Sequence, residues 1–524
     1  MKARLRFLLV PAALAAVSLF VVAAATARTS ASSSIIIDGT TDSVTNIDPA
    51  GNYDFGSGTV DYQIFNRLLE AGPGSLSPHP ALAKSCGFKG NLKTYACTLR
   101  QGVKFSNGDS FTSTDVKWSF DRVIKINDPS GISSLLTNLK SVTVNGAYGV
   151  VFHLKNPQST WPNILTTGAA QIVDHAVYPG DKILPNSSQH VGTGPYMLST
   201  FTPGQQVVLK PNPNYWGSPK PANGGVIINY YSKSSTMKLA LEKGDIDMAF
   251  QTFTPTELLS LQKEKGIKVH QGLAAVIRYL VMDVGDAATT TSSPTDELAV
   301  RQAVAYLFPR DTIAKRVYHG QVTPLYSMVP KGLPGHIDAF ASKYGKKPNK
   351  AKAAAVLSAA GVSTPVDVTF WYTPSHYGDA SADEFAEIQR ALDASGLFKV
   401  TLKSAEWAQY VNTLGSTKGV FQLGWYPDYV DGENYLLPFY PKGQFLQNGY
   451  SNPKMDALMK KEQGTKSVEA RLSVIKQAQR LAAQDVPIIP FWQGKMIAVS
   501  KNTVKGIDKT LDPTFILRFW LVSK

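Results

Sequence analysis

Cysteine is almost absent from this 524-residue chain, whose only two cysteines are Cys86 and Cys97. There is no CxxC motif and no paired Cys/His spacing, so the sequence does not support a structural zinc site. The two cysteines flank GFKGNLKTYA, a turn-bearing segment between two predicted strands. In an oxidising compartment we expect a disulfide, which contributes about 3 kcal/mol for so short a loop; two free buried thiols are the alternative.

The motifs of several enzyme classes are also missing. The chain has no GxSxG elbow, no HExxH, no phosphate-cradling GxxxxGK and no GxGxxG. None of the eight histidines has another histidine three or four residues away, so helical metal-binding pairs are absent. We therefore expect a protein that is not an enzyme and that uses neither a cofactor nor a metal. A secreted hydrolase that works with carboxylates is the alternative from another class.

Long apolar runs are missing except at the start of the chain, from Leu5 to Ala25. Three cations, Lys2, Arg4 and Arg6, precede this run, and the A-x-A pattern at residues 25–27 ends it. These features predict a signal peptide over residues 1–27, and a retained membrane anchor is the alternative. No cysteine directly follows the run, so we expect no lipid anchor. The mature protein is expected in the periplasm or at the outer face of the cell membrane.

The excess of positive charge is dispersed along the chain. The formal net charge is +14, or +11 without the three leader cations. No basic stripe is interleaved with aromatic residues, so we expect no nucleic-acid partner. Attraction of the positive charge to an anionic cell envelope is the simpler interpretation. Separately, we expect the protein to be a monomer.

Short strand-like runs alternate with helical patterns, which predicts an α/β fold. Residues 234–250 read as a helix that ends at Gly244, followed by an apolar strand. Asn349 and Gly361 fit the N-cap and the C′ position of a helix between them.

A second helix start is indicated by Ser381 and Glu384, which have the spacing of a capping box. Three residues then mark one apolar helical face: Phe385, Ile388 and Leu392.

The stretch GWYPDYVDGENYL, residues 424–436, packs three carboxylates and four aromatic rings into thirteen residues. Its acidic residues do not match the spacing of a calcium loop. A glycosidase carboxylate pair needs a spatial separation that the sequence does not give. Asp431 and Glu433 stand beside Gly432, and we interpret them as solvated loop charges.

The segment TYACTLRQGVKFSNGDSFTSTDVKWSFDRV, residues 94–123, resembles the extracellular solute-binding proteins of ABC importers, family 5, the dipeptide, oligopeptide and nickel class. Eight further motifs of that family recur in its order along the chain. They are NIDPA (46–50), VGTGPYML (191–198), NPNYWG (212–217), VRQAVAYLFPRDTIAKRVYHG (300–320), KAKAAAVLSAAG (350–361), GWYPDY (424–429), YSNPKMDALM (450–459) and DVPIIPFWQ (485–493).

The resemblance implies a two-lobed α/β protein of periplasmic-binding-protein type II (cluster C), with an extra subdomain in the first lobe. The expected divisions are residues 28–57, 188–272 and 488–524 for lobe I, 58–187 for its subdomain and 273–487 for lobe II. Such a protein closes its lobes over a solute and delivers it to the permease subunits of an ABC transporter. Closure is favoured by ligand contacts that exist only in the closed state.

The resemblance also implies a ligand site. In peptide-binding relatives, the aspartate of a W-x-A-D-Y motif pairs with the α-ammonium of the peptide, and W-Y-P-D-Y here places Trp425 and Asp428 at those positions. A buried ammonium needs such a partner. The other expected ligand-binding residues are Gly424, Tyr426, Tyr429, Tyr53 and Phe55. A turn or cap role for Asp428, and plain core packing for Trp425, Tyr53 and Phe55, are the alternatives.

Two departures from the family pattern bear on the ligand. Pro427 replaces the usual alanine, and Asp283 stands where relatives often carry asparagine. The extra negative charge would favour a cationic ligand or sit in a salt bridge. A small peptide is the leading ligand; a nickel complex, an oligosaccharide or another amine is the alternative. Nickel is disfavoured because no His/Cys set is clustered.

Overall fold

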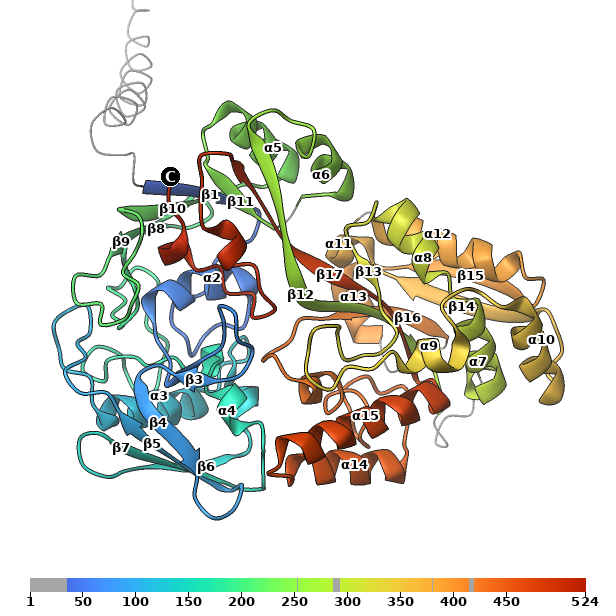
Figure 1. The fold of residues 1–524 in the computed structure, drawn as a ribbon, viewed down its shortest axis with the longest axis horizontal. Helices are drawn as coiled ribbons and strands as arrows, with labels where there is room; N and C mark the ends of the chain where they lie inside the picture. Colours follow the sequence, from blue (N-terminus) through green and yellow to red (C-terminus); the bar gives the residue numbers. More distant parts are fainter. Residues whose placement is uncertain (1–34, 252, 286–292, 379, 414–418) are drawn as a thin grey trace, which may run out of the picture.

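Two strands that are each more than a dozen residues long tie the two halves of the molecule together. The computed structural model describes residues 35–251, 253–285, 293–378, 380–413 and 419–524. The predicted signal peptide therefore lies outside the described residues. β12 (Ile267–Met282) and β17 (Ile488–Lys501) run antiparallel from Ile267↔Lys501 to Val281↔Ile488 and pass from one half to the other (Figure 1).

The long strands belong to an 11-stranded mixed sheet in the order β15-β14-β16-β12-β17-β11-β1-β10-β9-β8, with β13 paired to β17. We refer to the described residues within 35–266 and 502–524 as the first lobe, and to those within 283–487 as the second lobe. The remaining strands are β1 (Ile35–Thr40), β8 (Tyr196–Thr202), β9 (Gln206–Pro211), β10 (Gly225–Tyr230), β11 (Met248–Phe250), β13 (Thr323–Pro324), β14 (Val366–Tyr372), β15 (Phe398–Ser404) and β16 (Val420–Trp425).

In the first lobe, β1 lies between β10 and β11 and is parallel to both. The predicted helix and strand over residues 234–250 are confirmed as α5 (Ser234–Lys243) and β11, and Gly244 ends the helix with a φ of 84°. α6 (Pro255–Leu261) follows, and α2 (Phe55–Ile64) begins at the N-cap Asp54.

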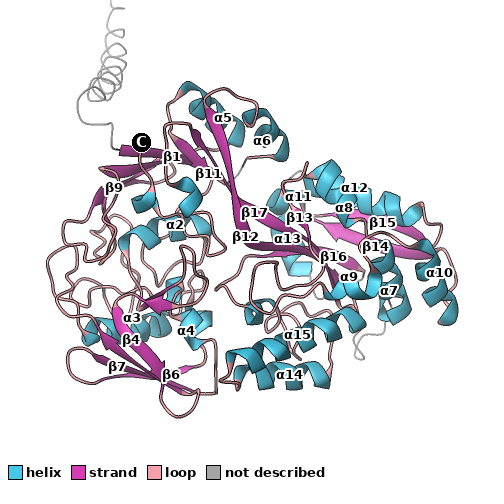
Figure 2. Ribbon diagram, in the orientation of Figure 1, coloured by secondary structure: helices cyan, strands magenta, loops and turns pink. Residues whose placement is uncertain are grey.

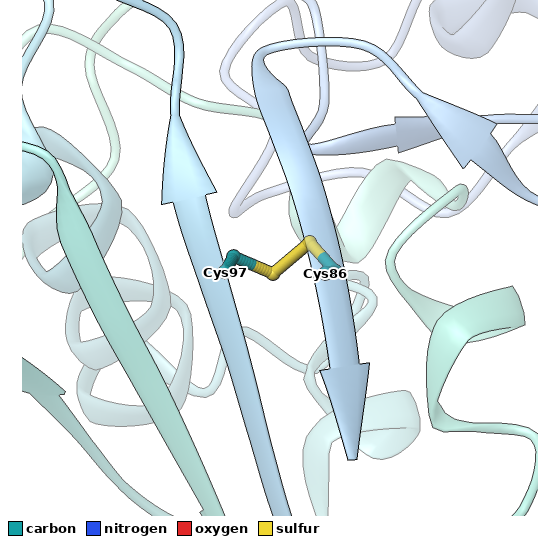
Figure 3. Close-up of a disulfide and its surroundings, with 2 residues drawn as sticks. All are labelled: Cys86 and Cys97. Carbon is teal, nitrogen blue, oxygen red and sulfur yellow. A yellow bond between two sulfur atoms is a disulfide. The ribbon is translucent and has the colours of Figure 1, made fainter. Parts of the chain in front are cut away.

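The subdomain of the first lobe is an antiparallel sheet in the order β4-β5-β7-β6, packed against α3 (Ser113–Ile126). Its strands are β4 (Ala83–Phe88), β5 (Thr94–Leu99), β6 (Leu139–Val144) and β7 (Gly149–Leu154). Cys86 and Cys97 face each other across the β4–β5 hairpin and are joined by a disulfide (Figure 3). The predicted pairing is confirmed.

Most of the helices cover the second lobe (Figure 2). They are α7 (Leu298–Leu307), α8 (Arg310–Thr312), α9 (Ala339–Tyr344), α10 (Lys350–Ala359), α11 (Pro374–Tyr377), α12 (Ala380–Asp393), α13 (Trp407–Thr413), α14 (Pro453–Gln463) and α15 (Val468–Asp485). The Asn349 cap is confirmed, because its side chain accepts the amide of Lys352 at 3.0 Å. Gly361 has a φ of 69° just beyond α10, which suits glycine.

The capping box predicted at Ser381 and Glu384 is wrong. Both residues lie inside α12 and are fully buried. The Glu384 carboxylate accepts hydrogen bonds from Gln422 Nε2, at 2.7 Å, and from Trp492 Nε1. The carboxyl therefore serves a long-range polar network that no local spacing reveals. The apolar face of the helix is confirmed, because Phe385, Ile388 and Leu392 are buried.

Within the described ranges, none of the helices combines the length and the apolar character needed to cross a membrane.

The disulfide yields a first prediction. Replacing both cysteines, Cys86→Ala with Cys97→Ala, should lower the free energy of unfolding by about 3 kcal/mol, because the cross-link restricts the unfolded hairpin. Urea unfolding of the variant and of the reduced native sequence should give matching midpoints. Thiol titration of unfolded, unreduced protein should find no free thiol, and two reactive thiols would contradict the pairing.

Candidate functional site

The acidic and aromatic stretch at residues 424–436 folds back on itself at the end of β16. The strand ends at Trp425, and a 3-10 helix, η7 (Gly432–Tyr435), follows a few residues later. Asp431 caps this helix, because its Oδ1 accepts the amide of Glu433 at 2.9 Å. The turn brings Asn434 back beside Trp425 and Asp428.

Asn434 positions the two central residues of the site. Its Oδ1 accepts hydrogen bonds from Trp425 Nε1 at 3.1 Å and from the amide of Asp428 at 2.9 Å. Its Nδ2 donates to Asp428 Oδ2 at 2.8 Å. Asn434 is only 2% exposed, so these bonds form away from bulk water. Sequence reasoning missed this residue, although it lies within the same thirteen-residue stretch.

Asp428 also contacts the opposite lobe. The hydroxyl of Tyr53, which precedes α2 in the first lobe, donates a hydrogen bond to Asp428 Oδ1. Each carboxylate oxygen therefore has one neutral donor, and the two donors come from different lobes. The structure thus brings together two of the predicted site residues that are 375 positions apart.

The electrostatics of Asp428 are those of an anion without a counter-ion. Burial raises its pKa above the usual value, and the hydrogen bonds from Asn434 and Tyr53 oppose this shift. Among the described residues, no cationic side chain forms an ion pair with Asp428 or stabilises its ionised form. A group that brings a positive charge to this carboxylate would therefore be strongly favoured.

An aromatic cluster lies beside Asp428 and spans both lobes. The ring of Phe55 lies 5.8 Å from Phe250, 6.2 Å from Phe515 and 6.3 Å from Tyr426 of the second lobe. Tyr426 is 58% exposed, yet burial raises its pKa. Tyr426 therefore gives the aromatic cluster a solvent-exposed wall.

Two other predicted site residues, Trp425 and Tyr429, are less exposed to solvent than Tyr426. Trp425 is partly buried and packs on Phe439 and Phe445, with ring centroids 5.1 and 6.0 Å away. Tyr429 is 7% exposed, and its hydroxyl donates to Glu433. The structure does not bring Tyr429 to the exposed wall.

Gly424 has a close-packing role in the structure. Its amide donates to the hydroxyl of Tyr377 at 2.8 Å, and a β-carbon at this position would collide with the guanidinium of Arg278. That guanidinium lies 3.4 Å from the centroid of the Tyr377 ring, so the glycine makes room for a buried cation–π contact.

The interpretation of Asp431 and Glu433 as solvated charges is wrong. Asp431 is 7% exposed and Glu433 is fully buried. Arg471 of α15 donates to Asp431 Oδ1 at 2.9 Å and to Glu462 Oε1 at 2.6 Å. Arg471 lies 40 positions beyond Asp431 in the sequence, so the residues next to Asp431 gave no sign of this ion pair.

The pKa values of Glu433 and Glu462 are both raised. Burial, together with the neighbouring carboxyl of Glu462, raises the pKa of Glu433 to about 8. Burial also raises the pKa of Glu462 to about 7, against the opposing effect of Arg471.

Asp283, the second departure from the family pattern, is buried in the second lobe. Its Oδ1 accepts the amide of Gly285 at 3.2 Å, so the carboxylate helps to close a local turn.

Comparisons with known proteins agree with the architecture. The sequence profile described as bacterial extracellular solute-binding proteins, family 5 Middle, matches residues 77–447. The probable D,D-dipeptide-binding periplasmic protein DdpA of Escherichia coli K12 is 26% identical over 474 residues, which cover 88% of each chain.

Two solved structures share the fold. The periplasmic binding protein DppA from Helicobacter pylori, described as ABC transporter-associated and in complex with peptide STSA, has a TM-score of 0.75 and 22% identity, over 95% of this chain and 99% of that chain. HbpA2 from Haemophilus parasuis has a TM-score of 0.81 and 21% identity, over 93% and 99%. The expected two-lobed α/β fold is confirmed.

The buried glutamates predict a loss of stability with rising pH. In the unfolded chain they titrate near 4.5, whereas the folded pKa values are about 8 and about 7. Between these limits the folded protein binds more protons than the unfolded chain, so the free energy of unfolding falls as the pH rises. Glu433→Gln keeps an acceptor for Tyr429 and should make this decline shallower, by about 1 kcal/mol per pH unit.

Thermal unfolding from pH 5 to 9 measures this effect. Glu264→Gln, a change at an exposed glutamate of the first lobe, is the control and should follow the native protein. Equal pH slopes in the native protein and the Glu433 variant would rule out a proton held at this site.

Proposed function

We propose, because the chain belongs to family 5 of the bacterial extracellular solute-binding proteins, that it captures a small peptide outside the cytoplasm and delivers it to the permease of an ABC transporter. Its location would be the periplasm or the outer face of the membrane, after removal of residues 1–27. The peptide-binding descriptions of DdpA and DppA support this choice of ligand class.

The observation that carries the proposal is the uncompensated carboxylate of Asp428. It is fixed by Asn434, it faces the opposite lobe through Tyr53, and no cation of the described chain neutralises it. The α-ammonium of a peptide supplies the missing charge together with three hydrogen-bond donors. The site would therefore hold a peptide by its amino end.

Closure of the two lobes over a ligand would follow from the fact that the residues of the site come from both lobes. Asp428 and Tyr426 belong to the second lobe, whereas Tyr53, Phe55 and Phe515 belong to the first. A ligand that touches both sets gains its full binding energy only when the lobes are together, so it shifts the population towards the closed state. The aromatic rings would exclude water from the ammonium and strengthen its pairing with the carboxylate.

Such a wall is also suited to varied sequences. Aromatic rings offer apolar surface and cation–π contact without requiring one particular side chain. Backbone pairing of an extended peptide with strand edges would add affinity that does not depend on its sequence.

Replacing Asp428 by alanine should weaken peptide binding by about 2–5 kcal/mol, the usual effect of removing one partner of a buried charge pair. The probe is the tightest binder from a panel of di- to pentapeptides, measured by calorimetric titration. Acetylating its amino group should give a loss of similar size in the native protein. In the Asp428→Ala variant, acetylation should change little, because both changes delete the same interaction.

The control for this cycle is Asp181→Ala, at an exposed aspartate of the subdomain, which should bind both peptides as the native protein does. Fully additive losses from Asp428→Ala and acetylation would show that Asp428 does not hold the amine.

The absence of catalysis is tested separately. Incubation with peptide and glycoside panels should give saturable, stoichiometric binding and no cleaved product. Turnover without stoichiometric binding would replace the receptor by a secreted hydrolase.

A further inference from the structure

A small pocket opens in the first lobe behind Phe55, at the end of β1. Its wall is formed by residues from β1, α2, β10 and β11 and by the loop after β1. The members that matter here are Asp38, Asp42, Thr59, Tyr230, and the rings of Phe55 and Phe250. The pocket thus combines two carboxyl groups, hydroxyl groups and two aromatic faces.

Asp38 is the most unusual group of the pocket. It is 1% exposed, and its Oδ1 has no hydrogen-bond partner among the described residues. Burial raises the pKa of Asp38 well above its usual value, opposed only by the backbone amide of Gly39. A buried carboxyl that serves only the fold would be expected to have partners.

The groups around Asp38 bring further oxygen atoms and negative charge to the pocket and, among the described residues, no positive charge that offsets them. The hydroxyl of Tyr230 is also unpartnered among the described residues. Burial and the neighbouring Asp54 raise the pKa of Asp42. Across the described chain, neither Asp38 nor Asp42 forms an ion pair with a lysine, arginine or histidine.

Asp54, a carboxylate of the same region, has a clear structural role and can be compared with Asp38. It caps α2 by accepting the amide of Ser57 at 2.8 Å, and it also accepts the hydroxyl of Thr45. Asp38 lies on a regular strand of the central sheet, and among the described residues no side chain donates a hydrogen bond to it.

We infer that this pocket is a second cation subsite, which takes the side-chain ammonium of a lysine in the captured peptide. The inference rests on the proposed function, because it assigns a preferred substrate class to the same binding cleft.

The position of Phe55 links the two sites. The Phe55 ring lines the pocket that contains Asp38. The same ring contacts Tyr426 in the aromatic cluster beside Asp428. A peptide held at Asp428 would need to send one side chain past Phe55.

The chemistry of the walls fits a long basic side chain. Lysine has an apolar stem that can pack on rings such as Phe55 and Phe250, while its small ammonium group pairs with carboxylates. The ammonium would supply donors to Asp38 Oδ1 and to the Tyr230 hydroxyl, which have no hydrogen-bond partner among the described residues. An apolar side chain in the pocket would leave these groups unsatisfied.

The test compares three tripeptides, Lys-Ala-Ala, Ala-Lys-Ala and Ala-Ala-Lys, each with its norleucine counterpart, which lacks the side-chain ammonium. By calorimetric titration, at least one lysine peptide should bind the native protein about tenfold or more tightly than its counterpart. Asp38→Asn should abolish this preference and leave norleucine binding within about twofold. Asp181→Asn, at the exposed subdomain aspartate, should keep the preference.

A second readout follows the proton on Asp38. The cation should bind the ionised carboxyl and displace its proton, so affinity for the lysine peptide should rise with pH. Titrations at pH 7 in buffers of different ionisation enthalpy should show more proton release with the lysine peptide than with its counterpart. Asp42, Asp54, Tyr230 and Tyr426 are the titratable groups around the pocket, and Asp38→Asn isolates the contribution of Asp38.

The outcomes separate the two proposals. Equal binding of lysine and norleucine peptides by the native protein would overturn the subsite and leave peptide capture standing. Failure of all six tripeptides and of the whole di- to pentapeptide panel to bind would refute peptide capture, and the side-chain pocket with it. Thermal unfolding of Asp38→Asn should occur at the native temperature or higher; a strongly lowered midpoint would show that the carboxyl serves the fold instead.

Discussion

The carboxylate of Asp428 lies in a crowded, partly buried place where the described residues offer it hydrogen-bond donors but no counter-ion. Neutral donors offset only part of the free energy that a carboxylate loses when it leaves water. A ligand cation at this carboxylate would remove the remaining deficit. The other features of the site take their meaning from this imbalance: Asn434 fixes the direction of the carboxylate, Tyr53 brings the opposite lobe to it, and the aromatic rings limit the access of water.

The sheet explains how such a site can be split between two lobes. β12 and β17 are paired over most of their length, and their register shifts between Leu273 and Ile277 and between Arg278 and Tyr279. Hydrogen bonding between the two strands keeps the lobes in one sheet, while the hydrophobic core of each lobe is built mostly from its own residues. Tyr429 of the second lobe is buried in the core of the first, and Phe515 of the first lobe packs against a core of the second, so lobe movement would need to disturb these contacts.

The features that could be predicted from the sequence are those formed by residues close together along the chain. The helix ending at Gly244, the Asn349 cap and the Cys86–Cys97 hairpin all involve neighbours along the chain, and all are present. The failures involve distant partners: Glu384 looks like a capping residue until Trp492 is placed beside it, and Glu433 looks solvated until α14 and α15 cover it. Asn434 was missed for a related reason, because only the folded turn returns it to Asp428.

The acidic cleft sits in a chain whose formal net charge is +14. At physiological ionic strength, charges more than about 8 Å apart through solvent are largely screened, so the dispersed surface cations should repel a cationic ligand only weakly. Inside the cleft the dielectric is lower, and nearby carboxyls dominate the interaction. The raised pKa values of Asp38 and Asp428 reduce the negative charge of these acids, and a nearby cation would favour their ionised forms. Ionisation of the site and capture of the ligand would then be a single coupled event, and the charge that makes binding strong would be present mainly in the bound state.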